Sequence, residues 1–66
     1  MITGEALVEL GFLDERNIKV YTNGRYDFEQ FMADSDEWGF YIDEKETEIS
    51  VTTMEEVHEL IKEYNI

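Results

Sequence analysis

The chain has 66 residues, of which 17 are acidic and five are basic, so its formal net charge is −12. A chain of this length forms one domain and hides only about 60% of the surface that its unfolded form exposes. The sequence contains no cysteine, which excludes a disulfide framework and a thiolate zinc site. Because phosphate contacts need clustered Lys and Arg, direct binding to nucleic acid or to an anionic membrane is disfavoured, and a basic partner is expected instead.

The first element that the sequence predicts is a short helix with Thr3 as its N-cap and Leu10 near its end. Gly11 followed by Phe12 is typical of a Schellman motif, in which the glycine is left-handed and the next side chain folds back toward Leu7. This stretch therefore indicates a helix end and part of the core.

Residues 14–16 are expected to form a polar turn, and residues 17–31 to form a hairpin about Asn23 and Gly24. A two-residue loop would place Val20 opposite Asp27 and so mix apolar and acidic residues on one face, which is unfavourable. A three-residue loop with Gly24 in a G1 bulge makes both faces chemically consistent and is the preferred register. It pairs Val20 with Tyr26, Ile18 with Phe28, Lys19 with Asp27 and Tyr21 with Arg25.

Two further strands are predicted after this hairpin, at residues 38–43 and 47–51, with a turn at residues 44–46. In the first of them Trp38, Phe40 and Ile42 alternate and are expected to face the core. A C-terminal helix follows, and Thr53 with Glu56 offers a capping box, as Thr52 with Glu55 does one residue earlier. The apolar positions of this helix recur with a 3.6-residue period; they are Met54, Val57, Leu60, Ile61 and Tyr64. The whole chain, residues 1–66, is thus expected to be one α+β domain: a four-stranded antiparallel meander with the N- and C-terminal helices packed on one face.

The preferred register leaves three aromatic residues on the uncovered face of the sheet: Tyr21, Phe31 and Tyr41. They would lie among charged residues, namely Lys19, Arg25, Asp27, Glu29, Asp43 and Glu48. Aromatic residues ringed by charge are typical of a protein interface. The alternative is that Tyr and Phe simply suit strands.

Sites for chemistry are not indicated by the sequence. Asp34, Asp36 and Gly39 match positions one, three and six of a calcium loop, but Trp38 at position five and Lys45 at position twelve do not, so no metal is expected. The single histidine, His58, has no cysteine and no recognisable serine nucleophile to act with. Because the four glycines are isolated, a phosphate loop is not predicted. We therefore expect neither an enzyme nor a cofactor.

Two motifs, residues 7–12 (LVELGF) and residues 51–61 (VTTMEEVHELI), resemble small acidic proteins encoded by bacteriophages and mobile elements of gut bacteria. The resemblance covers about a quarter of the chain. It implies a phage-type context, in which very small acidic proteins are often inhibitors of host defence enzymes.

The sequence thus predicts an acidic protein-binding module, a DNA-mimic or anti-CRISPR-like inhibitor that blocks a basic surface of a nucleic-acid-binding protein or nuclease. A self-associating accessory protein, with charge serving only solubility, is the alternative, and a small-ligand sponge is a third possibility. With no apolar run of about 20 residues and no basic-then-apolar amino terminus, a cytoplasmic location in the bacterial host is expected. The expected acidic contacts are Glu55, Glu56, Glu59 and Glu63 on the C-terminal helix and Asp34, Asp36 and Glu37 in the loop before the third strand; the aromatic face would bind a partner or form a dimer.

Overall fold

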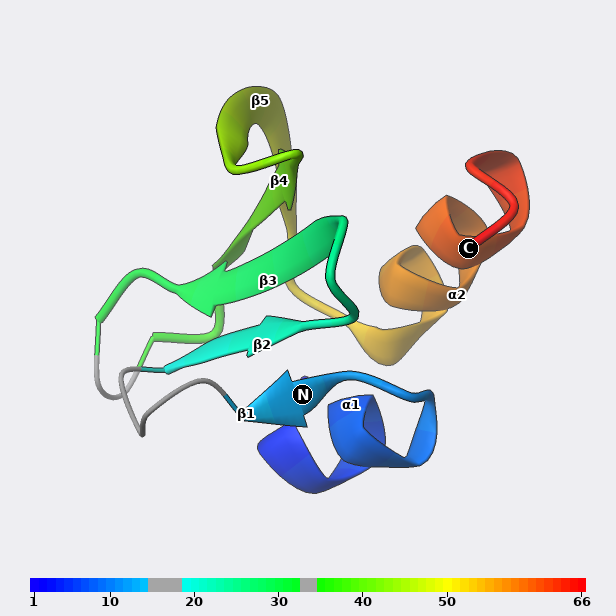
Figure 1. Ribbon diagram of the computed structural model, residues 1–66. Helices are drawn as coiled ribbons and strands as arrows, with labels where there is room; N and C mark the ends of the chain where they lie inside the picture. Colours follow the sequence, from blue (N-terminus) through cyan, green and yellow to red (C-terminus); the bar gives the residue numbers. More distant parts are fainter. Residues whose placement is uncertain (15–18, 33–34) are drawn as a thin grey trace.

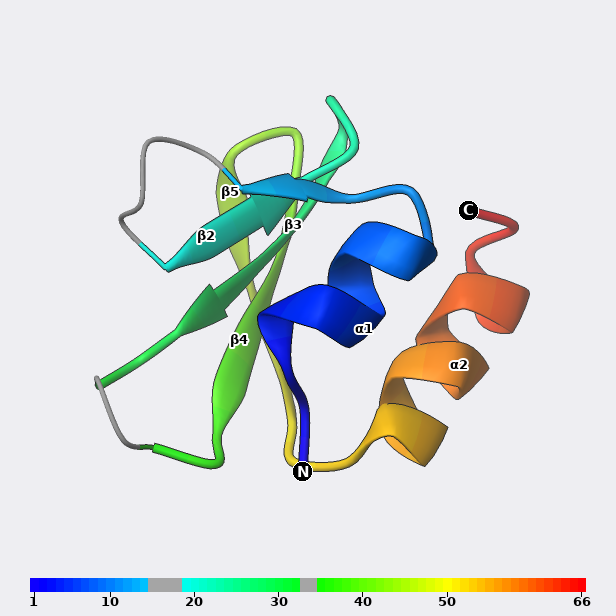
Figure 2. The same ribbon diagram turned by 90° about the horizontal axis from the view of Figure 1, so that it is seen from below.

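The computed structural model describes residues 1–14, 19–32 and 35–66. These residues form a five-stranded antiparallel sheet in which each strand pairs with the next along the chain (Figure 1). Two helices cover one face of the sheet (Figure 2). The α+β class and the placement of both helices on one face are as predicted, but the predicted number of four strands is wrong, because Leu13 and Asp14 add a short strand at the edge of the sheet. The elements are α1 (Gly4–Glu9), β1 (Leu13–Asp14), β2 (Val20–Thr22), β3 (Tyr26–Gln30), β4 (Trp38–Ile42), β5 (Lys45–Val51) and α2 (Met54–Glu63).

The N-terminal helix α1 begins and ends as the sequence predicts. The Thr3 hydroxyl accepts a hydrogen bond from the first turn, and Gly11 has a left-handed backbone with φ of 99°. The Phe12 amide donates to the Leu7 carbonyl at 3.0 Å, which is the outer bond of the Schellman motif. Both Leu7 and Phe12 are fully buried, so the helix end also anchors the core.

The polar turn predicted at residues 14–16 is wrong at its first residue, because Asp14 belongs to β1 and pairs with β2. Glu15 and Arg16 lie outside the described residues. The hairpin register is also wrong. Val20 pairs with Glu29, Tyr21 with Phe28, and Thr22 with Asp27, whereas the predicted partner of Ile18 cannot be compared because Ile18 lies outside the described residues. Val20 therefore faces outward and Tyr21 faces the helices, opposite to the prediction.

The loop and the core together explain this register. The Asn23 side chain accepts hydrogen bonds from the amides of Arg25 at 3.1 Å and Tyr26 at 2.8 Å. These bonds hold the connection between the strands at residues 23–25, one residue later than the expected loop at residues 22–24. Turning the strand over brings the Tyr21 ring to 5.9 Å from the Trp38 ring. An aromatic side chain buries more apolar surface than valine would, so the core gains from the exchange.

The strands β4 and β5 join through a tighter turn than the predicted residues 44–46. Asp43 and Glu44 both have positive φ, 52° and 65°, as a two-residue type I′ turn requires, and β5 already begins at Lys45. Along β4 the predicted inward positions, Trp38 and Phe40, are buried. This alternation, which the sequence predicted, places the residues between them on the outer face.

The C-terminal helix α2 has the predicted capping box at Thr53 and Glu56. At its other end the sequence analysis missed a second Schellman motif, in which Asn65 is left-handed (φ 56°) and the Ile66 amide donates to the Ile61 carbonyl at 2.9 Å. Between the helices and the sheet lies one aromatic-rich core. Its buried members are Ile2, Leu7, Phe12, Phe28, Trp38, Phe40, Val51, Val57 and Leu60.

None of the helices formed by the described residues is long and apolar enough to span a membrane.

Candidate functional site

The outer face of the sheet carries two aromatic rings beside a glycine. A Cβ atom placed on Gly39 would lie 2.8 Å from the Phe31 ring and 3.2 Å from the Tyr41 ring. Both rings therefore flank Gly39, and the missing side chain lets them approach the backbone. Phe31 is 47% exposed, which is unusual for a phenylalanine in a small domain and makes this pair of rings a candidate contact surface.

Carboxylates surround the Tyr41 ring. The Tyr41 hydroxyl donates to Glu29 Oε1 at 2.8 Å, and the cross-strand partners of Tyr41 are Asp27 on β3 and Glu46 on β5. The hydrogen bond to Glu29 raises the pKa of Tyr41 to about 12, with further contributions from burial and from the negative charges of Glu29 and Glu46. We call the set of Asp27, Glu29, Phe31, Tyr41 and Glu46 the outer patch.

The outer patch includes a shallow hollow of about 150 Å³, which Val20 and Glu44 also line. The half-buried Val20 side chain lies beside Glu29 and Tyr41 there. The hollow is too small and too open for an ordinary ligand, which needs a cleft of roughly 300 Å³ or more. It has the dimensions of a recess for one side chain of a partner.

Negative charge on the outer patch has no basic partner in the part of the chain that the structure describes. Among the described residues, the ion pair with an N–O distance of 4.0 Å or less is that of Arg25 Nε with Asp43 Oδ1, at 3.5 Å. It lies at the hairpin ends, outside the outer patch, and both side chains are largely exposed. Asp27, Glu29 and Glu46 thus present three unpaired carboxylates, within the part that the structure describes, around an aromatic centre.

Of the three aromatic residues predicted for this face, Phe31 and Tyr41 lie there and Tyr21 does not. Tyr21 lies on the covered face against Trp38, because the register of β2 places its ring inward. Among the predicted acidic residues of the loop, Glu37 lies beside the outer patch: its backbone carbonyl accepts from the Phe31 amide at 3.3 Å, and its carboxylate accepts from Ser50 Oγ at 3.4 Å. Asp36 is exposed next to it, and Asp34 lies outside the described residues.

The four acidic residues predicted on the C-terminal helix are exposed, but they lie on the other side of the molecule from the outer patch, since α2 covers the opposite face of the sheet (Figure 2). They are Glu55, Glu56, Glu59 and Glu63. One flat partner surface cannot contact both sets at once.

Glu56 accepts more hydrogen bonds than the predicted capping box requires. Its carboxylate accepts from the Thr52 amide at 3.0 Å, from the Thr52 hydroxyl at 3.0 Å and from the Thr53 amide at 3.2 Å. These hydrogen bonds, the one from the Thr52 amide first, lower the pKa of Glu56 below its usual value. Because these hydrogen bonds occupy Oε1, one of its two carboxylate oxygens, Glu56 is less available to a partner than Glu55, Glu59 or Glu63.

No family model, no curated protein and no solved structure matches this chain.

Proposed function

We propose that this protein is an acidic protein-binding module that places the outer patch on a basic, nucleic-acid-binding surface of another protein and thereby blocks it. The observation that carries the proposal is the arrangement of Tyr41 and Phe31 inside a ring of carboxylates without basic partners among the described residues. Central aromatic residues supply affinity in protein interfaces, and surrounding charges supply steering and selectivity. The resemblance of the two end motifs to phage proteins supports an inhibitor of a host protein as the biological role.

The outer patch is a better contact surface than the acidic side of α2. That side contains exposed glutamates without an aromatic residue among them, and one of its four acids is engaged in the helix cap. The outer patch has both kinds of group, and the hydrogen bond from Tyr41 to Glu29 holds two of them in place before binding. We assign long-range attraction to the α2 glutamates, since a net charge of −12 raises the rate of encounter with a basic partner.

Self-association through the same patch is the competing function. A symmetric dimer formed face to face would bring the carboxylates of Asp27, Glu29 and Glu46 against their own copies, and like charges across an interface oppose binding. Sedimentation equilibrium at low and high salt separates the two functions. A dimer that persists at low salt and dissociates on Tyr41→Asp substitution would favour self-association over our proposal.

Capture from a lysate of the native host tests the proposal directly. The immobilised protein should retain a basic nucleic-acid-binding protein, and excess double-stranded DNA should release it because the two compete for one surface. Raising the ionic strength from about 0.1 M to about 1 M, which shortens the screening length from about 10 Å to about 3 Å, should also weaken capture.

Matched variants locate the contact. Tyr41→Ala should reduce affinity for the captured protein at least about tenfold. The triple change of Asp27, Glu29 and Glu46 to their amides should weaken binding more than the triple change of Glu55, Glu59 and Glu63, although both remove the same charge. Equal losses from the two triple variants, or capture that DNA does not compete, would contradict the proposal.

A further inference from the structure

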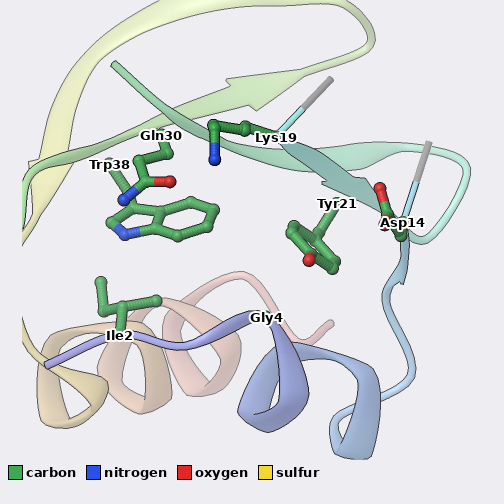
Figure 3. Close-up of a pocket in the computed structure, with 7 residues that line it drawn as sticks. All are labelled: Ile2, Gly4, Asp14, Lys19, Tyr21, Gln30 and Trp38. Atoms are coloured by element: carbon green, nitrogen blue, oxygen red, sulfur yellow. The ribbon is translucent and has the colours of Figure 1, made fainter. Parts of the chain in front are cut away.

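A cavity of about 260 Å³ lies on the covered face of the sheet, between the sheet and the chain segment that leads into α1 (Figure 3). Its floor is formed by Ile2 and Gly4, and the Trp38 and Tyr21 rings form its walls. Asp14, Lys19 and Gln30 complete the lining. The cavity is separate from the outer patch, which lies on the other face of the same strands.

Groups of opposite sign line this one space. Figure 3 shows the Lys19 ammonium and the amide oxygen of Gln30 both directed over the Trp38 ring, with the Asp14 carboxylate beyond Tyr21. No ion pair within 4.0 Å joins Lys19 to Asp14. The cavity therefore offers one cationic donor and two acceptors that are left, within the described part of the chain, for a bound molecule.

The polar lining is held in place by the backbone and by neighbouring groups. Gln30 Nε2 donates to the Ser35 carbonyl at 2.8 Å, which orients the amide and leaves its oxygen free to accept. The Lys19 carbonyl accepts from the Gln30 backbone amide at 3.0 Å, and the backbone of Lys19 is left-handed, with φ of 63°. Such a backbone conformation is uncommon for lysine.

The two ring walls depend on a close contact with the helix segment. A Cβ atom on Gly4 would overlap the Tyr21 hydroxyl, so the absence of a side chain there is what lets the ring stand upright in the cavity. The Trp38 side chain is 3% exposed, and its Nε1 atom has no hydrogen-bond partner among the described residues. The two rings are thus fixed by packing, and the surface that the cavity offers to a bound molecule is mainly polar.

We infer that this cavity binds a small zwitterion of amino-acid size, with its carboxylate at the Lys19 ammonium and its ammonium at the neighbouring amide oxygen of Gln30. A volume of about 260 Å³ lies just below the usual range for ligand pockets, which limits the ligand to a few heavy atoms beyond its charged groups. A molecule with several phosphates would face one cation inside a protein of net charge −12. A zwitterion satisfies both signs and adds no net charge.

Nuclear magnetic resonance titration with L-leucine tests this inference, since the one tryptophan gives one indole N–H signal as an internal reporter. L-Leucine should shift that signal with a Kd of about 1 mM or tighter. Isocaproate lacks the ammonium and isoamylamine lacks the carboxylate, so each should bind at least about fivefold more weakly.

Lys19→Met should weaken L-leucine binding at least about fivefold, whereas Lys45→Met, which removes the same charge from the first residue of β5, should not. The spectra of the two variants also report whether each is folded. Isocaproate binding as well as L-leucine, inorganic phosphate binding more tightly than L-leucine, an unmoved indole signal at about 10 mM L-leucine, or equal losses from both lysine variants would overturn the inference.

Discussion

Replacing Glu29 by Gln should lower the pKa of Tyr41, because the hydrogen bond and the negative charge of Glu29 are among the causes that raise it to about 12. With a pKa of about 12, about one-tenth of the Tyr41 side chains are ionised at pH 11, whereas a tyrosine of ordinary pKa is about nine-tenths ionised there. The variant should therefore gain phenolate absorbance at pH 11. Tyr41→Phe identifies which part of the signal from four tyrosines belongs to Tyr41.

Glu48→Gln is the matched control for this titration, since it removes one carboxylate from an exposed position of β5 that does not contribute to the Tyr41 pKa. If Glu29→Gln and Glu48→Gln give the same absorbance at pH 11, the hydrogen bond from Tyr41 to Glu29 does not hold in solution. The geometry that we assign to the outer patch would then be refuted.

The same group links stability to pH, with a definite sign. A raised pKa means that the folded state retains its phenol proton where the unfolded state has lost it, so the contribution of Tyr41 is fully present below pH 10. That contribution should be lost as the pH rises toward 12. The difference in unfolding free energy between the protein and Tyr41→Phe should shrink over this interval.

Two further predictions concern α2. Leu60→Ala should lower the unfolding free energy by about 2–5 kcal/mol, because Leu60 is 7% exposed, whereas Ile61→Ala should cost less because Ile61 is only partly buried; equal losses in urea unfolding would contradict the burial. Thr53→Ala should cost about 1 kcal/mol through loss of the capping box. Hydrogen bonds from Thr52 and Thr53 lower the pKa of Glu56, so the stabilisation that its carboxylate provides should be present at neutral pH and be lost as the pH falls through the lowered pKa; a cap contribution that is constant with pH would contradict it.

Local rules predicted the elements whose ends are determined by neighbouring residues. The Schellman end of α1 needs only a glycine after Leu10, and the capping box of α2 needs only Thr53 and Glu56 at the right spacing. The inward side of β4 follows from strict alternation of Trp38 and Phe40 with smaller or more polar neighbours. Such signals are complete within a few residues, so the sequence contains them.

The hairpin register could not be found in this way, because it depends on groups far apart in the chain. Matching apolar with apolar residues across the strands favoured Val20 inward, yet the structure places Val20 beside Glu29 and turns Tyr21 toward Trp38. The contact with Trp38 requires β4 to have joined the sheet, and the apolar surface that Tyr21 buries there offsets the partial exposure of Val20. Comparing side-chain pairs within one hairpin leaves out the contact between Tyr21 and Trp38, because Trp38 belongs to another strand.

The candidate site was predictable only in part, for a related reason. Helical periodicity shows that Glu55, Glu59 and Glu63 face solvent, but it does not show which solvent-facing surface also carries aromatic residues. That surface became visible only when pairing placed Asp27 and Glu46 beside Tyr41. Glu46 was expected in a turn, so its part in the outer patch had no signal in the sequence.

The register of β2 connects the two proposals and also keeps them independent. Because side chains alternate between the two faces of a strand, turning β2 over removes Tyr21 from the outer face and adds it to the cavity on the covered face. Lys19, directly before β2, lines the same cavity. Tyr41 then remains as the aromatic centre of the outer patch, and Lys19 is the cation of the cavity. The outer patch and the cavity share strands but no lining residue. Loss of partner capture in Tyr41→Ala and loss of L-leucine binding in Lys19→Met therefore report on separate surfaces. Either proposal can fail while the other stands.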